Sequence, residues 1–346
     1  MTEPIKLTQH SKGSGCGCKI SPSVLKDILE CSDVLPTDER LWVGNETADD
    51  AAVMQWSGAE GLIATTDFFM PMVDDAYSFG KIAAANALSD VYAMGGSPMM
   101  ALAILGWPIE KLPASKAREV LEGARFICRM AGIPLAGGHS IESAEPIFGL
   151  AVNGRVTKSN LVRNSSARVG DMLYLTKPLG NGIVTAAMKR GQLQDDAHLE
   201  ACVSYMSTLN KLGEKLAETV EVHAMTDVTG FGLAGHLLEM CEGSGLSAQI
   251  DFASVPVYPF LDSYVAAHIY PDMTMKNYAH YASNINQLTL PQLLVMCDPQ
   301  TSGGLLIAVP EEAASSLEQR MHEFGLGAFA RPIGVMKERG EKMLSV

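Results

Sequence analysis

The sequence is short of positive charge. Its 346 residues include 26 Lys and Arg against 39 Asp and Glu, which gives a formal net charge of −13. Long contacts with nucleic acid depend on Lys and Arg side chains that neutralise phosphates, so this balance argues against a nucleic-acid-binding protein. A small polyanionic ligand stays compatible with the charge if metal ions mediate its binding.

Long apolar runs are also missing. No stretch reaches the roughly 18 uncharged apolar residues that a membrane span requires, and the N-terminus lacks the basic-then-apolar pattern of a signal peptide. Seven cysteines form an odd set, and the later ones lie mostly among apolar neighbours, as is usual in a reducing compartment. We therefore expect a cytoplasmic protein that makes no membrane contact.

Several common motifs are absent. The chain has no Gly-x-x-x-x-Gly-Lys-Ser/Thr P-loop, no Cys-x-x-Cys redox pair and no short internal repeat. His10, Cys16 and Cys18 supply three candidate zinc ligands where a structural site needs four. A structural zinc site is therefore disfavoured.

What the sequence does contain is a glycine-rich segment near its start, Gly13-Ser14-Gly15-Cys16-Gly17-Cys18-Lys19. Glycines let the backbone swing and approach a ligand closely, and the nearby Lys19 cation should favour the thiolate form of Cys16. Taken alone, such a segment is more often a plain flexible terminus. Together with the rest of the chain, it predicts a mobile arm that carries a reactive thiol.

The first 45 residues read as this arm followed by a helix at 22–29. Strand and helix patterns then alternate through residues 46–157, which predicts a mixed α/β domain. We predict helices at 79–94 and 113–130, and strands at 62–66, 100–105, 133–136 and 147–156.

Residues 157–170 are polar and form the best candidate for a domain boundary. A second α/β domain is predicted over 168–346, since 47% hydrophobic residues in a chain of this length can fill two cores. Its predicted elements are a strand at 172–176, one long helix with Leu199, Cys202, Met206, Leu209 and Leu212 on one face, a strand at 305–309 and a helix at 311–324.

Six aspartates occur where a surface carboxylate is unexpected, because each lies beside apolar or glycine-rich sequence. Asp90 falls in the last turn of its predicted helix, where the helix dipole disfavours an anion, and Asn86 shares its face. Oxygen ligands converging from several loops are what Mg²⁺ uses when it also binds phosphates. The six are Asp49, Asp50, Asp67, Asp90, Asp227 and Asp298.

Each aspartate also has a simpler explanation. Asp49, Asp50 and Asp298 could cap helices, and Asp227 could be a turn residue before its glycines. For any one of them alone, these structural roles are at least as good an interpretation as metal binding.

Glycine-rich turns form the other half of the predicted site. Gly137-Gly138-His139-Ser140 follows a predicted strand, and similar turns occur at 226–232 and 301–304. Consecutive backbone N–H groups in such turns can cradle phosphate oxygens. His139 could act as a base, although its setting favours a structural hydrogen-bonding role.

Taken together, these motifs resemble the selenophosphate synthetase (selenide, water dikinase) family over nearly the whole chain. The wider aminoimidazole ribonucleotide synthetase superfamily shares the aspartate and glycine loops but not the Cys-Gly-Cys-Lys arm. Ala48 departs from relatives that carry a basic residue, so a nucleotide contact there must come from backbone. The resemblance rests on the arm with Cys16 and Lys19, and on residues 44–53, 65–71, 86–98, 137–140, 226–236 and 298–304.

The resemblance implies two α/β domains in a PurM-like architecture, and a homodimer with ATP bound near its interface in a cleft closed over by the arm. The implied reaction converts ATP, selenide and water to selenophosphate, AMP and orthophosphate. Mg²⁺ is implied, as are a K⁺ requirement and a selenium-delivery protein. The implied Mg²⁺ ligands are Asp50, Asp90 and Asp227.

The same resemblance implies the residues that contact ATP or its metal-bound phosphates. Lys19 would touch the phosphates, and Cys16 would be essential for the selenium step, either by holding selenium covalently or by lining its pocket. Cys18 ranks below Cys16. The remaining implied contacts are Thr47, Ala48, Asp49, Asp67, Asp90, Gly138, His139 and Ser140.

Two other interpretations stay open at this point. A different phosphotransferase of the superfamily would use the aspartates and leave the arm idle. A non-catalytic thiol or metal sensor built on His10, Cys16 and Cys18 would bind metal through the arm and leave the aspartates unexplained.

Overall fold

The computed structural model describes residues 5–20, 24, 28, 38–44 and 49–346. The predicted helix at 22–29 falls mostly on residues outside this set, and Thr47 and Ala48 lie outside it entirely.

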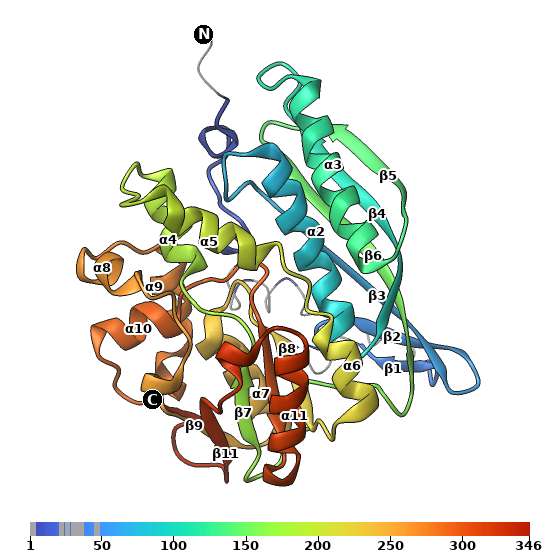
Figure 1. The fold of residues 1–346 in the computed structure, drawn as a ribbon, viewed down its shortest axis with the longest axis vertical. Coiled ribbons are helices and arrows are strands. Elements are labelled where there is room, and N and C mark those ends of the chain that lie inside the picture. The colour runs from blue at the N-terminus through green and yellow to red at the C-terminus, as the bar shows by residue number, and fades with distance from the viewer. Residues whose placement is uncertain (1–4, 21–23, 25–27, 29–37, 45–48) are drawn as a thin grey trace.

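The N-terminal half forms a six-stranded sheet in the order β1-β2-β3-β6-β4-β5. Neighbouring strands are antiparallel except β4 and β5, which are parallel. Helices α2 and α3 pack together on one face of this sheet (Figure 1). The elements are β1 (Leu41–Val43), β2 (Ala52–Ser57), β3 (Glu60–Phe69), α2 (Ala76–Ala93), β4 (Ser97–Trp107), α3 (Ala114–Ala131), β5 (Leu135–Glu142) and β6 (Ile147–Thr157).

Helix α2 is the central element of the molecule. Nearly all of its residues are buried, because it contacts the first sheet on one side and β8, α5 and α6 of the second half on the other. Its many alanines let several elements approach at once, and a Cβ on Gly80 would lie 1.9 Å from the Val120 carbonyl oxygen of α3. The N-terminus is capped by Asp75, whose carboxylate accepts from the Ser78 N–H.

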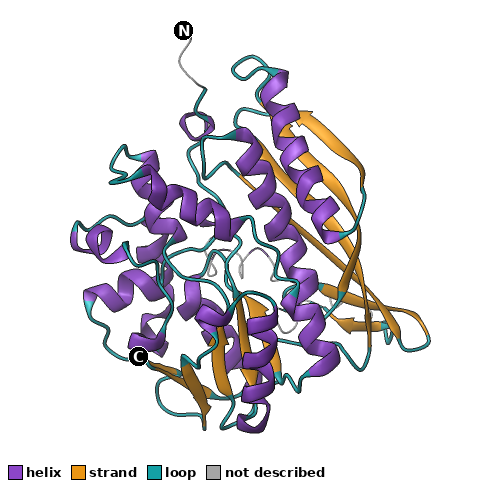
Figure 2. Ribbon diagram, in the orientation of Figure 1, coloured by secondary structure: helices purple, strands orange, loops and turns teal. Residues whose placement is uncertain are grey.

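The C-terminal half forms a second six-stranded sheet in the order β12-β9-β11-β7-β10-β8, with helices packed around it (Figure 2). Its strands are β7 (Met172–Leu175), β8 (Ala224–Asp227), β9 (Ser247–Ile250), β10 (Leu305–Val309), β11 (Gly334–Lys337) and β12 (Leu344–Ser345). Its helices are α4 (Asn181–Lys189), α5 (Asp196–Met206), α6 (Leu212–Thr219), α7 (Gly232–Ser244), α8 (Leu261–Ala266), α9 (Asp272–Tyr281), α10 (Leu290–Met296) and α11 (Glu311–Glu323).

Short 3₁₀ turns complete the chain, and two of them belong to the N-terminal arm. These turns cover Leu7–His10, Cys16–Cys18, Phe252–Ser254, Ala282–Asn284 and Gly327–Phe329. Within the described residues, no helix combines the length and the apolar character that a membrane crossing requires.

Most predicted elements are confirmed, including α2 with Asp90 in its last turn, α3, β3, β4, β6, β7, β10 and α11. The single long helix predicted through Leu199 and Leu212 is wrong, because the chain breaks into α5 and α6. The break serves tertiary contacts: the Thr208 carbonyl accepts from Lys177 Nζ, and Asn210 Nδ2 donates to Ser89 Oγ and to the Gly303 carbonyl.

The glycine turn predicted at Gly137–Ser140 is also wrong, since these residues lie inside β5, at the edge of the first sheet. Gly137 and Gly138 have φ values of 145° and 150°, which favour glycine. A Cβ on Gly138 would lie 2.1 Å from the Ala103 carbonyl oxygen of β4. The glycines therefore allow close strand pairing instead of forming a phosphate-binding turn.

Candidate active site

A cleft of about 630 Å³ lies where the first sheet and α2 meet the loops of the second half. Its walls carry far more acid than base, so we call it the acidic cleft. The carboxylates that line it are those of Asp49, Asp50, Asp67, Asp90, Asp227 and Glu239. Five of the six predicted aspartates thus meet at one place although they come from four separate segments of the sequence.

The end of α2 organises one wall of the acidic cleft. Asn86 and Asp90 lie one turn apart, and Asn86 Nδ2 donates to Asp67 Oδ2 over 2.5 Å. Thr65 Oγ1 donates to Asp90 Oδ2, which ties the helix to the neighbouring strand β3. The predicted shared face of Asn86 and Asp90 is confirmed, and it positions Asp67 as well.

For three of these carboxylates, the surroundings disfavour the ionised form. Burial, followed by the Asp227 charge, raises the pKa of Asp50 well above its usual range, and burial followed by Asp67 does the same for Asp90. Burial also raises the pKa of Asp227. The Oδ2 atoms of Asp50 and Asp227 are buried without a hydrogen-bond partner among the described residues. Such atoms are expected where a bound cation is the missing partner.

The donor set suits Mg²⁺ bound together with phosphates. Among the described residues, no three His, Cys, Asp or Glu side chains converge tightly enough to cage a metal ion by themselves. Mg²⁺ in nucleotide sites is typically held by one or two carboxylates, with phosphate oxygens and waters completing its shell. The acidic cleft offers oxygen ligands of that kind from three elements.

The arm lies across both halves of the molecule. The Gly15 N–H donates to the Met70 carbonyl of the first half over 2.9 Å, and the Cys16 N–H donates to Thr301 Oγ1 of the second half over 3.0 Å. Lys189 Nζ of α4 donates to the carbonyls of Ser11, Lys12 and Gly13. These contacts hold the arm in a closed position.

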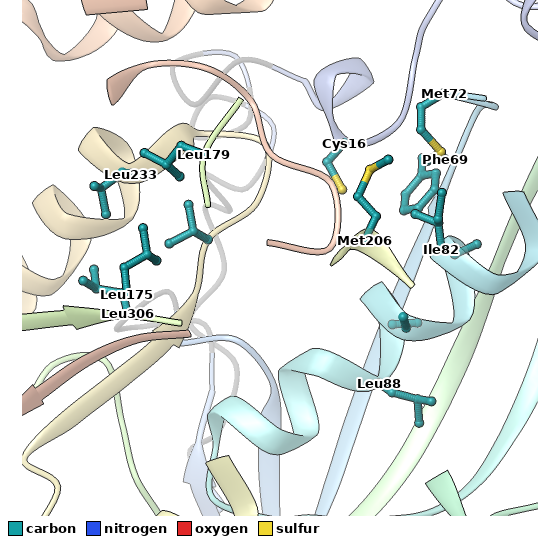
Figure 3. Close-up of a cluster of buried hydrophobic side chains, with 14 of the residues drawn as sticks. Cys16, Phe69, Met72, Ile82, Leu88, Leu175, Leu179, Met206, Leu233 and Leu306 are labelled. Atoms are coloured by element: carbon teal, nitrogen blue, oxygen red, sulfur yellow. The ribbon is translucent and has the colours of Figure 1, made fainter. Parts of the chain in front are cut away.

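Cys16 is only 1% exposed. Its Sγ lies 3.3 Å from Asn86 Oδ1, which also accepts from the Ser302 N–H. Figure 3 shows the thiol grouped with the ends of Met206, Met72 and Phe69 at the edge of the apolar core. The predicted reactive cysteine therefore reaches the amide that orients Asp67, in surroundings that are soft and apolar.

The ammonium group of Lys19 begins a chain of hydrogen bonds that could not be seen in the sequence alone. Its Nζ donates to Thr229 Oγ1 over 3.4 Å, Thr229 Oγ1 lies 3.2 Å from His236 Nε2, and His236 Nδ1 lies 3.1 Å from Glu239 Oε2. The ammonium also lies over the Phe231 ring. His236 lies within the 226–236 motif, so the sequence could have indicated it. Its pairing with Glu239 could not be predicted in the same way, because it depends on both residues lying on one face of helix α7.

Burial by itself would lower the pKa of Lys19, but the surrounding charges, Asp67 foremost, outweigh it and raise the pKa above its usual value. Lys19 is therefore cationic across the physiological pH range, and it faces the carboxylates of the acidic cleft.

Gly138, His139 and Ser140 are not brought to this cleft. Asp67 pairs with Leu150, Leu150 with Ala103, and Ala103 with Gly138, which puts three strand spacings, about 14 Å, between Asp67 and Gly138. Within one copy of the chain, the predicted ATP contacts of β5 lie away from the aspartates.

Two aspartates accept hydrogen bonds from backbone N–H groups of distant segments. Asp49 Oδ1 accepts from the Asn164 N–H while it lines the cleft. Asp298 lies outside the acidic cleft and its carboxylate accepts from the Gly182 N–H in the first turn of α4 and from Gln300 Nε2. Asp298 is therefore not the N-cap of a following helix, since the N-cap of α4 is Gly180, but it accepts a hydrogen bond from the first turn of α4 across a long sequence distance.

Two family models match the chain, one for each half. Residues 48–156 match the family described as "AIR synthase related protein, N-terminal domain", and residues 168–346 match "AIR synthase related protein, C-terminal domain". A protein named selenide, water dikinase from Colwellia psychrerythraea is 54% identical over 95% of each chain. One from Pseudomonas putida is 53% identical over the full length of both chains.

The chain belongs to the selenide, water dikinase family. Among solved structures, the thiamine-monophosphate kinase of Stenotrophomonas maltophilia superposes with a TM-score of 0.64 at 18% identity, covering 93% of this chain and 94% of that one. The hydrogenase maturation protein HypE, in complex with ATP, gives 0.64 at 21% identity, over 85% and 82%. These two likenesses concern the fold, and they confirm the two-domain PurM-like architecture expected for a selenide, water dikinase.

Asp298 generates a pH-dependent prediction. Burial raises its pKa to about 8, while in the unfolded chain it titrates near 4. Between these values the folded state holds the extra proton, so its contribution to the free energy of unfolding falls as pH rises from about 4 to about 8 and is level above that. The free energy of unfolding of the wild type should therefore fall relative to that of Asp298→Asn as pH rises across this window. Thermal unfolding of the two proteins at several pH values measures the difference. A difference independent of pH would contradict the assignment.

Proposed function

We propose that this chain catalyses ATP-dependent synthesis of selenophosphate from selenide, with water as the second acceptor and AMP and orthophosphate as the other products. The relatives at 51–54% identity carry the name of this activity. The observation that carries the proposal is the position of Cys16 and Lys19, on an arm closed over the acidic cleft.

On the nucleotide side, we propose that Asp50, Asp90 and Asp227 hold Mg²⁺ and that Asp67 lies beside the metal-bound phosphates. Bound Mg²⁺ would supply neutralisation of the phosphate charge, which is the main requirement of phosphoryl transfer. The chain itself supplies position: Asn86 and Thr65 fix Asp67 and Asp90, and Lys19 adds a permanent positive charge.

On the selenium side, selenide near neutral pH is already deprotonated and soft, so it needs capture and protection more than a strong base. A covalent sulfur–selenium bond formed from selenide and a thiol would require an oxidant that the reaction does not supply. We therefore propose that Cys16 lines the selenium pocket without a covalent link. Its burial beside Phe69 and Met72 keeps water from the reacting atoms.

The reaction and the role of the arm are tested together by ³¹P NMR. Anaerobic incubation with ATP, Mg²⁺ and selenide should give AMP, orthophosphate and a new selenium-bonded phosphorus signal, and Cys16→Ser should lose that signal because a hydroxyl is smaller and less polarisable than the thiol that lines the selenium pocket. Cys18→Ser is the matched control and should keep it. ADP as the end product, or turnover that ignores selenide, would reject the proposed reaction, and full activity in Cys16→Ser would reduce Cys16 to a structural residue.

Mg²⁺ binding is tested without turnover. Asp227→Asn removes one of several buried, mutually repelling carboxylates, so the metal-free variant should be more stable than the wild type by about 1 kcal/mol, or about 2–4 °C in melting temperature. Mg²⁺ with the non-hydrolysable analogue AMPPCP should raise the melting temperature of the wild type and leave Asp227→Asn nearly unchanged. Asp262→Asn, an exposed change outside the cleft, should respond like the wild type, and an equal response of Asp227→Asn would remove it from the ligand set.

A homodimer is proposed because no described element covers one face of the first sheet. Helices α2 and α3 lie on the opposite face (Figure 1), and the register puts alternate residues of β3, β4 and β5 on the open side. An exposed apolar patch of this kind is typical of a protein interface. Its large side chains are Phe68, Met100, Leu102 and Ile141, each 37–60% exposed.

A second copy would also account for Gly138, His139 and Ser140. His139 shares the open face with Ile104 and Phe68, because the three occupy one row across the sheet. We propose that β5 of one subunit approaches the nucleotide of the other, so that ATP is bound near the interface. The resemblance-derived contacts of β5 would then act across subunits.

The interface is tested by Leu102→Glu, which places a charge on the open face. We expect a fall from dimer to monomer mass in light scattering after size-exclusion chromatography, together with weaker ATP binding. Met130→Glu, on an exposed part of α3, is the matched control and should stay dimeric. A wild-type monomer, or a monomeric Leu102→Glu with unchanged ATP affinity, would refute the shared site.

The remaining expectations are less constrained. We place the reaction in a reducing cytoplasm, because Cys128, Cys202, Cys241 and Cys297 are buried free thiols. The K⁺ requirement and a selenium-delivery protein stay predictions. Among the described side chains, Cys16 Sγ lies beside Asn86 Oδ1 and joins no group of His, Cys, Asp or Glu that could hold a metal ion, so the sensor alternative gains no support from them.

A further inference from the structure

A second cavity of about 710 Å³ lies against the arm. Lys19 is its one wall residue in common with the acidic cleft, and the rest of the two walls differ. Its walls come from the arm, from α4 and from α9, with Thr301 beside the Cys16 backbone. We call it the basic cavity after its charged lining residues, Lys12, Lys19, Lys189, Arg190, Lys276 and Asp272.

The charge of this lining is opposite to that of the chain. Five cations face one carboxylate, in a protein whose formal net charge is −13. Arg190 and Asp272 form an ion pair of 3.4 Å, and Lys189 binds the arm carbonyls. The ammonium groups of Lys12 and Lys276 have no carboxylate within 4.0 Å among the described residues, so the cavity keeps a positive surplus.

A buried hydroxyl adds an independent sign of a ligand. Ser14 Oγ is shielded from solvent and has no hydrogen-bond partner among the described residues, yet Ser14 lies in the cavity wall. A buried polar atom is normally satisfied. In its present rotamer this atom is closed to the cavity as well as to solvent, so a ligand oxygen in the cavity reaches it once the Ser14 side chain rotates about its Cα–Cβ bond.

We propose that the basic cavity binds a phosphate-class oxyanion, which we identify with the phosphorylated product leaving the active site. Ammonium groups and hydroxyls suit oxyanions, and the volume is that of a small-molecule site instead of a pocket for a single selenium atom. The identity of the ligand rests on the proposed function, which makes two such products, orthophosphate and selenophosphate. Lys19 links the site where they form to the cavity that receives them.

The test measures binding and not turnover. The nucleotide cleft of the full-length protein is first saturated with Mg²⁺ and AMPPCP, and inorganic phosphate or thiophosphate is then titrated by isothermal calorimetry. We expect saturable binding of one anion per chain, weakened at least tenfold in the Lys12→Ala/Lys276→Ala double variant. Lys337→Ala, an exposed change on β11, is the matched control and should bind like the wild type.

The two probes separate the sources of the ligand. Tighter binding of thiophosphate points to selenophosphate, and equal or tighter binding of phosphate points to orthophosphate. Absence of binding to the AMPPCP-loaded protein, or equal affinity in the double variant and the wild type, overturns the inference. Because this assay needs no selenide, its failure is distinguishable from a failure of the proposed reaction, which the ³¹P NMR products report.

Discussion

Repulsion among buried carboxylates is the constraint on which the site depends. Asp90 and Asp227 are buried and Asp50 is partly buried within one cleft, where burial and then neighbouring charges, that of Asp227 among them, raise the pKa of both Asp50 and Asp90. Such an arrangement costs stability in the protein alone and is relieved when a cation enters. The fold tolerates it because α2 is buried along nearly its whole length between α3, the first sheet and the second half, so its last turn cannot move away to separate the charges.

The arm completes this arrangement from outside both domains. Lys19 supplies one permanent positive charge to the acidic cleft, and the backbone around Gly15 passes close to Thr301, where a Cβ would lie 2.3 Å from its Oγ1. The same few residues bury Cys16 against Asn86. In its closed position the arm therefore does three things: it brings the Lys19 charge to the acidic cleft, it excludes water, and it places the Cys16 thiol beside Asn86. Lys189, which binds three consecutive arm carbonyls, holds that closed position.

Charge is distributed unevenly around the arm. The acidic cleft is suited to cations that accompany a nucleotide, and the basic cavity is suited to anions without a metal. The same arm borders both, and its Lys19 lies in the wall of each. An enzyme that splits one polyanion into three products has a physical reason to keep separate places for the metal-bound nucleotide and for a released oxyanion.

Much of this could be predicted from the sequence. Apolar periodicity is a local property, so it located α2, α3 and most strands, and the position of Asp90 and Asn86 on one helix face followed from the 3.6-residue turn. The Cys-Gly-Cys-Lys arm and the aspartate motifs also identified the family, because they combine residue types that few other chemistries need together.

Other features depended on contacts between distant residues. Gly137–Ser140 looked like a turn, but pairing with β4 makes it an edge strand, and only that register shows that these residues cannot reach their own cleft. The break between α5 and α6 lets the Thr208 carbonyl accept from Lys177 and lets Asn210 donate to the Gly303 carbonyl. His236 is positioned by Glu239, one helical turn away, and by Thr229. The sequence by itself determined the family and the fold class, and it predicted the chemistry of the arm and the aspartates. The tertiary structure alone decided which of them meet, because strand register, burial and mutual electrostatics are properties of residues far apart in the chain.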